Sequence, residues 1–145
     1  MIKEIRHVGI VVKNLKKSLH FYQNVLGFKK FDEGIVVKKD AVNFYKMEYE
    51  VKWVKLRLGA GTMLELYNII DVQSRFAYAY ENSPMGFSLN HIALTVDDIN
   101  KYHKLLDKHG RCLCRIKESN NHMVFFARDP DENLIEFVQP PNRKK

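Results

Sequence analysis

A short motif occurs twice in this chain, 84 positions apart, and this repeat limits the folds that the sequence can adopt. The two copies are Arg6-His7-Val8-Gly9-Ile10-Val11-Val12 and Asn90-His91-Ile92-Ala93-Leu94-Thr95-Val96. In each copy a histidine opens a segment rich in β-branched residues, which favour strands, and two polar residues then lead into a segment of helical periodicity. The chain is therefore expected to contain two modules of one design.

A second pair of matching segments carries a glutamate between apolar residues, at Leu64-Glu65-Leu66 and at Ile135-Glu136-Phe137. The first histidine precedes its glutamate by 58 residues and the second by 45 residues. The longer spacing coincides with segment 38–50, which mixes charged and aromatic residues. We interpret this segment as an insertion in the first repeat that forms a loop, a lid or an irregular hairpin.

Periodicity predicts the same order of elements in both halves, namely a strand, a helix and three further strands. In the first half the strands are expected at 2–12, 28–37, 51–58 and 62–69, and the helix at 15–26, between Asn14 as its N-cap and Gly27 as its C-cap. In the second half the strands are expected at 89–96, 112–118, 122–128 and 133–139, and the helix between Asp98 and Gly110. The connector 70–88 is expected to include a short helix at 74–80.

The expected architecture is an α+β fold of one domain, residues 1–145. Tandem βαβββ modules at about 2–69 and 88–139 are expected to form a cleft-shaped mixed sheet with the helices on its outer face. A length of 145 residues, with 46% apolar and 28% charged residues, is typical of a globular domain with a buried core. No apolar stretch approaches the ~18 residues of a membrane span, and charges near the first residue interrupt any signal-peptide core. We expect a cytoplasmic protein without membrane contact.

The net charge of +7 is compatible with a small anionic substrate, with nucleic acid, or with a merely solvated basic surface. The lysines are scattered and no helix-turn-helix, RNA-recognition or zinc-finger pattern is present, so nucleic acid is not the expected partner. Cys112 and Cys114 would share one face of a strand, a poor geometry for bridging, and no further cysteine could complete a zinc site. We expect two free thiols.

The two histidines and two glutamates are expected on the strand faces that point away from the helices. The alternate positions of the same strands carry the aliphatic and aromatic residues on which helices pack, namely Val8, Ile10, Leu64, Leu66, Ile92, Leu94, Ile135 and Phe137. A single histidine or glutamate on a strand is more often a structural or solvent-facing residue, but four in matched positions favour a shared site. The other histidines, His20, His103, His109 and His122, are expected on the solvated surface.

Two carboxylates embedded among apolar residues need a compensating charge, because an uncompensated buried carboxylate is strongly unfavourable. Imidazole nitrogen and carboxylate oxygen suit Zn, Ni, Co, Mn or Fe(II), and this donor set does not choose among them. We predict one divalent metal ion held by His7, Glu65, His91 and Glu136.

The segments His7–Val12, Leu19–Phe28, Met63–Leu66, His91–Asp98 and Asp129–Phe137 carry a resemblance that covers nearly the whole chain. The doubled β-α-β-β-β pattern resembles the vicinal oxygen chelate superfamily, which includes glyoxalase I, methylmalonyl-CoA epimerase, extradiol dioxygenases, and fosfomycin- and bleomycin-resistance proteins. One departure is Glu132, where the family's turn usually has glycine. This departure affects the geometry of the turn more than the site.

The resemblance implies a metal-dependent lyase or isomerase. In glyoxalase I the ligands are His, Glu, His and Glu in this order, whereas the epimerase commonly has Gln in the second place. Dioxygenases and fosfomycin enzymes use three ligands, which leaves Glu65 unexplained. The resemblance therefore implies proton transfer beside a carbonyl through a metal-stabilised enediolate, with Glu136 as the base and Glu65 as its counterpart. An epimerase-like isomerase and a non-catalytic, resistance-type binding protein remain as alternatives.

The resemblance also implies a small-molecule substrate, for which an anionic thiol adduct and an acyl-CoA both stay open. Neither a glutathione-binding nor a CoA-binding set of residues can be matched, although segment 83–86 slightly resembles the epimerase. Superfamily members usually cover exposed sheet edges by pairing, which implies a homodimer. Phe44, Tyr45 and Met47 in the insertion are candidates for a dimer contact or a lid.

Overall fold

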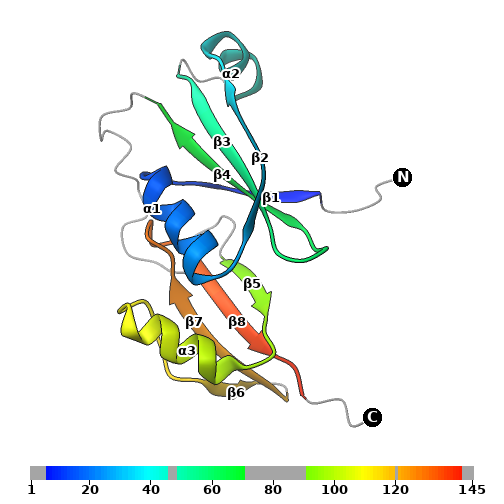
Figure 1. The fold of residues 1–145 in the computed structure, drawn as a ribbon, viewed down its shortest axis with the longest axis vertical. Coiled ribbons are helices and arrows are strands. Elements are labelled where there is room, and N and C mark those ends of the chain that lie inside the picture. Colours follow the sequence, from blue (N-terminus) through cyan, green and yellow to red (C-terminus); the bar gives the residue numbers. More distant parts are fainter. Residues whose placement is uncertain (1–5, 46–48, 71–90, 120, 142–145) are drawn as a thin grey trace. The chain divides into compact units, whose positions relative to one another are not determined.

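The structure is a computed structural model that describes residues 6–45, 49–70, 91–119 and 121–141. The chain divides into two compact units, Met1–Ala79 and Tyr80–Lys145 (Figure 1). Each unit contains one copy of the repeated histidine motif and one of the embedded glutamates. The sequence repeat is therefore also a repeat of compact structure, and whether the two units act as one domain stays a prediction.

The first unit is built on a four-stranded sheet in the order β1-β4-β3-β2. Its strands are β1 (His7–Val11), β2 (Lys29–Val36), β3 (Val51–Arg57) and β4 (Met63–Ile69). β1 pairs with β4 in parallel, and the two other pairings are antiparallel. The parallel pair requires a long connection, which α1, β2 and β3 provide.

The second unit has the same topology, in the order β5-β8-β7-β6. Its strands are β5 (His91–Thr95), β6 (Lys117–Ser119), β7 (His122–Arg128) and β8 (Leu134–Gln139). β5 pairs with β8 in parallel, and the other two pairings are again antiparallel. The predicted α+β class and the tandem βαβββ modules are confirmed, as two four-stranded mixed sheets.

Helical segments follow the first strand of each unit, as predicted. Asn14 caps α1 (Leu15–Leu19) by accepting a hydrogen bond from the backbone N–H of Lys17 at 3.0 Å, and Asp98 caps α3 (Ile99–Lys108) in the same way. The predicted first helix continues past α1 as a π-helix, η1 (His20–Val25), in which both Phe21 and Tyr22 are buried. No helix in the described parts of the chain is long and apolar enough to cross a membrane.

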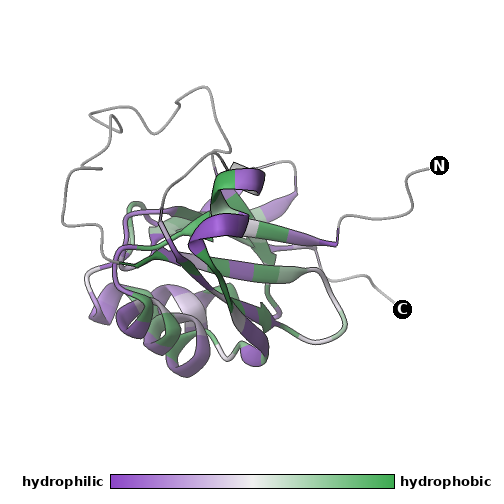
Figure 2. Cartoon of the chain, turned by 90° about the horizontal axis from the view of Figure 1, so that it is seen from above, coloured by the Kyte–Doolittle hydropathy of each residue, from purple (hydrophilic) through white to green (hydrophobic). Residues whose placement is uncertain are grey.

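The core of each unit lies on the sheet face predicted for it. Leu64 and Leu66 of β4, and Ile135 and Phe137 of β8, are almost completely buried. In the second unit α3 covers this face, where Tyr102 stacks on Phe137 with 5.9 Å between the ring centroids. Hydrophilic and hydrophobic residues occur together along the helices and strands in Figure 2, as expected for elements with one buried face.

The prediction of a loop, lid or hairpin at 38–50 is wrong for most of that segment, because residues 38–45 form a helix, α2 (Lys38–Tyr45). The helix begins with backbone bonds from the N–H groups of Asp40 and Ala41 to the carbonyl of Val37, and Ala41 is fully buried. The charged residues at its start obscured the helical spacing of the apolar ones. α2 joins β2 to β3, where the second unit has a short connection between β6 and β7, so the place predicted for the insertion agrees with the structure.

The predicted strand at 112–118 is shorter than expected, since only Lys117–Ser119 form β6. Cys112 forms a single bridge with Ala127, and the chain then leaves the β7 ladder at Cys114. There the backbone N–H of Phe126 donates to the sulfur of Cys114, and the carbonyl of Cys114 contacts the His103 ring at 3.2 Å. These contacts replace the regular ladder. Predictions for residues 2–5, Met47, the helix at 74–80 and segment 83–86 fall outside the described residues.

Candidate functional site

His7 and Glu65 lie beside each other in the first unit. His7 opens β1, and Gly9, two residues further on, is opposite Glu65 of β4. Because side chains alternate along strands, this register places both on the sheet face away from the buried Leu64 and Leu66. The Nε2 atom of His7 is 2.9 Å from Oε2 of Glu65. Two of the four predicted metal ligands therefore lie in contact, and their binding of a metal stays a prediction.

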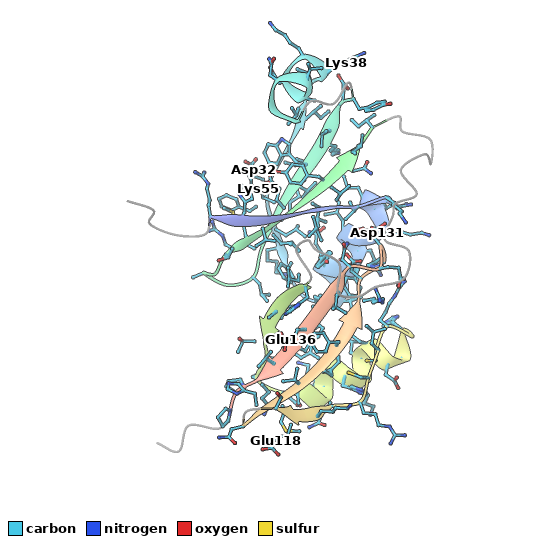
Figure 3. The ribbon with its side chains drawn as sticks, turned by 180° about the vertical axis from the view of Figure 1, so that it is seen from behind. Asp32, Lys38, Lys55, Glu118, Asp131 and Glu136 are labelled. Carbon is cyan, nitrogen blue, oxygen red and sulfur yellow. The ribbon has the colours of Figure 1, made fainter. Side chains whose placement is uncertain are left out.

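The carboxylate of Glu65 is almost completely enclosed, with 5% of its side chain exposed. Besides His7, it accepts a hydrogen bond from the hydroxyl of Tyr67 at 2.7 Å, and the Nζ atom of Lys55 lies 3.6 Å from its other oxygen. Lys55 is itself held over the ring of Trp53, 4.4 Å from the ring centroid (Figure 3 labels Lys55). These partners compensate the buried charge and fix the position of Glu65.

Two glycines allow the aromatic rings of this face to lie close to the sheet. A Cβ atom at Gly9 would come 2.7 Å from the ring of Tyr67, and one at Gly34 would come 2.6 Å from the ring of Trp53. Real side chains do not approach so closely, so the rings occupy the space that any other residue would fill. Gly9, within the first histidine motif, thus allows Tyr67 to reach Glu65.

His91 and Glu136 form the corresponding pair in the second unit. Ala93, two residues after His91, is opposite Glu136 of β8, which repeats the register of the first unit. The Nε2 atom of His91 is 3.1 Å from Oε2 of Glu136. The Glu136 side chain (labelled in Figure 3) is 21% exposed, compared with 5% for Glu65. The His91 ring lies edge-on to Phe126. The second glutamate is therefore less enclosed than the first.

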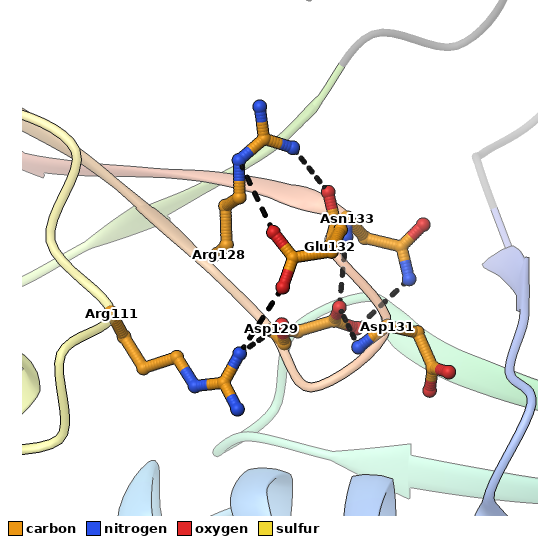
Figure 4. Close-up of polar contacts among 6 residues, drawn as sticks. All are labelled: Arg111, Arg128, Asp129, Asp131, Glu132 and Asn133. Atoms are coloured by element: carbon orange, nitrogen blue, oxygen red, sulfur yellow. Dashed lines mark hydrogen bonds and ion pairs between the residues drawn. The ribbon is translucent and has the colours of Figure 1, made fainter. Parts of the chain in front are cut away.

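The turn at Asp129–Asn133 leads the chain into β8 and so sets the position of Glu136 (Figure 4). The buried Asp129 accepts hydrogen bonds from the backbone N–H groups of Asp131 and Asn133, both at 2.8 Å, and from the amide of Asn133. Glu132 adopts a left-handed conformation with φ of 70° and makes ion pairs with Arg111 and Arg128 at 3.4 and 3.6 Å. The turn is therefore closed on Asp129 with a glutamate at its left-handed position.

The donors of the two pairs fit a divalent transition metal. Each pair presents one imidazole nitrogen and one carboxylate oxygen, the donor types that zinc and its neighbours accept. The Nδ1 atom of His7 is buried and has no hydrogen-bond partner among the described residues, so it is a further nitrogen donor that these residues leave unused. Among the described residues, neither unit alone contains three or more side chains grouped to hold a metal ion.

Sequence reasoning did not assign Tyr67, Lys55 and Trp53 a role in the surroundings of Glu65. The signal was available, because Glu65 and Tyr67 are two apart on one strand, as are Trp53 and Lys55 on the next. The missing information was the register of β3 against β4, which places Lys55 opposite Glu65. A long-range register cannot be read from the strand pattern alone.

His103 is a correction to the predicted solvated histidines, since it is half-buried. Its ring contacts the carbonyl of Cys114 and lies 5.0 Å from the ring centroid of Phe125. His20 is exposed, as predicted. Cys112 and Cys114 are free thiols, as predicted, and burial is the main cause that raises the pKa of Cys112 from 9.0 to about 11, with nearby Asp107 adding to it.

Residues 4–137 match the model of the Glyoxalase/Bleomycin resistance protein/Dioxygenase superfamily. A lactoylglutathione lyase of Neisseria meningitidis serogroup A is 31% identical over 141 residues, which cover 92% of this chain and 88% of that protein.

Two solved structures resemble the chain over most of their length. A glyoxalase family protein of Bacillus cereus aligns with a TM-score of 0.83 at 17% identity, covering 98% of this chain and 97% of that one, which supports the fold alone. A trypanothione-dependent glyoxalase I of Leishmania major aligns with a TM-score of 0.67 at 25% identity, covering 95% of this chain and 87% of that one. The chain therefore belongs to the Glyoxalase/Bleomycin resistance protein/Dioxygenase superfamily.

Proposed function

We propose that this protein is a metal-dependent lyase or isomerase of the glyoxalase I type, which moves a proton next to a carbonyl group of a small molecule. The observation that carries this proposal is the repeated register of the two His–Glu pairs, His7 with Glu65 and His91 with Glu136. The similarity to a lactoylglutathione lyase over nearly the whole chain supports the same reaction class. We further propose a cytoplasmic homodimer as the working form.

In this proposal His7, Glu65, His91 and Glu136 would hold one divalent metal ion. When bound, such an ion supplies Lewis acidity to the oxygen beside the reacting carbon. The chain's own residues then have two tasks, which are to keep the donors in place and to accept and return the proton.

Glu136 is the better candidate for the base that moves the proton. Its contact with His91 is the one ion pair found for it among the described residues, and a fifth of its side chain remains exposed. Glu65 is instead held by His7, Tyr67 and Lys55 and is closed to solvent. A base must change partners during the reaction, so the less restrained carboxylate suits that role and the enclosed one suits a fixed ligand.

The second candidate function is a non-catalytic protein of the resistance type that binds a small molecule. The family description includes bleomycin resistance proteins, so membership alone does not distinguish the two functions. A binding protein has no need for a carboxylate beside a histidine in each repeat. An epimerase-like isomerase would use the same proton transfer on an acyl-CoA.

The test is exchange of solvent deuterium into candidate hemithioacetals and acyl-CoA thioesters by metal-loaded protein, because exchange reports proton abstraction without knowledge of the product. We expect exchange into one of these classes, and a loss of roughly 10²–10⁴-fold in Glu136→Gln, the usual contribution of a positioned general base. Glu118→Gln, which changes an exposed glutamate of the same unit, is the matched control and should retain the wild-type rate (Figure 3).

Two outcomes would contradict this account. If metal-loaded wild-type protein exchanges none of the candidates, the binding-protein function is favoured. If exchange survives in Glu136→Gln, the protein is an enzyme of this kind but Glu136 is not its base.

A further inference from the structure

A recess of about 570 Å³ lies at one end of the first unit's sheet. It is bordered by the end of β3, the start of β4 and the loop between them, and its lining residues are Arg6, Phe31, Arg57, Ala60, Gly61, Thr62 and Met63. This volume falls in the range of ~300–1,000 Å³ that is usual for small-molecule sites. Met63 is opposite His7 in the β1–β4 register, so the recess adjoins the strand positions of the His7–Glu65 pair.

The recess is strongly basic for its size. Arg6 and Arg57 both line it, and the described residues of its lining include no aspartate or glutamate. In the part of the chain that the structure describes, no carboxylate lies within ion-pair distance of either guanidinium. Elsewhere in the described chain arginines do find acidic partners, as Arg111 and Arg128 do with Glu132. The charge of this recess is therefore not neutralised by the described residues.

Arg57 is held in place although no described residue provides it with an acidic partner. Its guanidinium lies over the ring of Phe31, 4.1 Å from the centroid, and its Nη2 atom is 3.6 Å from the sulfur of Met63. Its Nε atom is buried and has no hydrogen-bond partner among the described residues. A buried donor without an acceptor is costly and uncommon in folded proteins, so this atom points to a group that the described residues do not supply.

We propose that this recess binds the oxyanionic group of a small organic ligand, with Arg57 as the main donor and Arg6 as the second charge. An arginine whose planar guanidinium is fixed by packing is suited to bind two oxygens of one carboxylate or phosphate at once. Phe31 and Met63 give the recess an apolar side against which the rest of the ligand can lie. Assignment of this anion to the substrate rests on the proposed function, whereas anion binding itself does not.

The test is an NMR titration of full-length, metal-free protein, because anion binding in the recess requires no metal. The probes are inorganic phosphate and succinate, with neutral succinamide and sodium chloride at matched ionic strength as references. We expect saturable shifts of the Arg57 side-chain Nε–H signal and the Gly61 amide, with a dissociation constant of ~1–10 mM for at least one of the two anions. A response to phosphate alone or to succinate alone identifies which oxyanion the recess prefers.

Variants of the arginines and of one control lysine test whether the anion binds in the recess. Arg57→Gln should weaken binding at least tenfold, and Arg57→Lys, which keeps the charge but not the planar donor pair, should give an intermediate affinity. Lys52→Gln removes one charge from the same strand outside the recess and should bind like wild type. If Arg57→Gln does not fold, Arg6→Gln serves the same purpose, with an expected loss of threefold or more.

Equal shifts with succinamide or sodium chloride, or undiminished binding in Arg57→Gln, would overturn the proposal. Its failure can be distinguished from failure of the proposed function. If anions bind but no deuterium exchange occurs, the anion subsite is supported and the proposed enzymatic function is not. If exchange occurs but anions do not bind, the proposed function is supported and the subsite is not.

Discussion

At the scale of single residues, Glu65 shows how the chain itself can surround a buried carboxylate with polar partners. Burial of an isolated carboxylate is unfavourable, but His7, Tyr67 and Lys55 each contact one of its two oxygens. Tyr67 can do so because Gly9 leaves room for its ring. The environment of Glu65 therefore depends on residues that lack metal-binding chemistry of their own.

Tyr67→Phe should destabilise the metal-free protein by about 1–2 kcal/mol, because it leaves a buried carboxylate oxygen with one fewer donor. The measurement is urea denaturation followed by circular dichroism. Tyr49→Phe, at a tyrosine that is 40% exposed, is the matched control and should stay within about 0.5 kcal/mol of wild type. Equal stability of the two variants would show that the Tyr67 hydroxyl contributes nothing to the fold.

Cys112 should be a poor nucleophile in the folded protein. Burial raises its pKa to about 11, so at pH 8 its reactive thiolate is about 100-fold rarer than at the ordinary value of 9.0. Alkylation by iodoacetamide at pH 8, followed by mass spectrometry of the Cys112 peptide, should therefore accelerate by about that factor when the protein is unfolded in urea. A similar rate in both states would contradict the raised pKa.

The raised pKa of Cys112 also makes the free energy of unfolding depend on pH. A group whose pKa is higher in the folded state favours folding at pH values below its unfolded pKa. Its contribution is lost as the pH rises from about 9 through about 11. Cys112→Ser should therefore reduce the fall in stability across this alkaline range.

At the scale of elements, most strands and the helices that follow β1 and β5 could be anticipated from periodicity and caps. Asn14, Asp98, Gly27 and Gly110 mark helix ends, and the glycines have the positive φ values that such positions need. α2 could not be anticipated in the same way, because its first turn is charged and its apolar spacing is short. The shortened β6 depends on contacts of Cys114 with Phe126 and His103, which no local pattern reveals.

Part of the candidate site could also be predicted from the sequence. The four proposed ligands stand out because they recur in two repeats, and the structure places them as two pairs with one register. Lys55 and Arg57 could not be identified, because their importance depends on what lies opposite or around them. Lys55 is opposite Glu65 across β3 and β4, and Arg57 packs between Phe31 and Met63.

The turn before β8 yields a prediction at the same scale. Glu132 has φ of 70°, a conformation that costs a residue with a Cβ roughly 1–2 kcal/mol and glycine little. Its ion pairs with Arg111 and Arg128 are well exposed and contribute at most about 1 kcal/mol. Glu132→Ala loses these pairs and keeps the strain, so it should be less stable than Glu132→Gly by about 1 kcal/mol.

Thermal denaturation of the two Glu132 variants in one buffer provides the comparison. An alanine variant as stable as the glycine variant would mean that the turn stores no strain at this residue. Asp131→Ala is the reference for loss of a charged side chain. Asp131 is next to Glu132 in the turn and does not have a positive φ.

At the scale of the whole molecule, the central feature is that each unit carries one His–Glu pair in the same register of a parallel strand pair. A pair offers two donors, whereas tetrahedral metal sites in proteins use four ligands. Neither unit has a third donor grouped with its pair among the described residues. We propose that both pairs contribute to one site, and this is the claim that most needs a direct test.

The most direct measurement is the metal content of tag-free protein, loaded with a divalent transition metal and freed of excess, by elemental analysis. We predict about one metal ion per chain in wild type and in His20→Ala, which changes an exposed histidine outside the pairs. His7→Ala and His91→Ala, one in each unit, should both lose most of the metal, since each removes one of four ligands. Retention of the wild-type amount in either variant would contradict a centre built from both pairs.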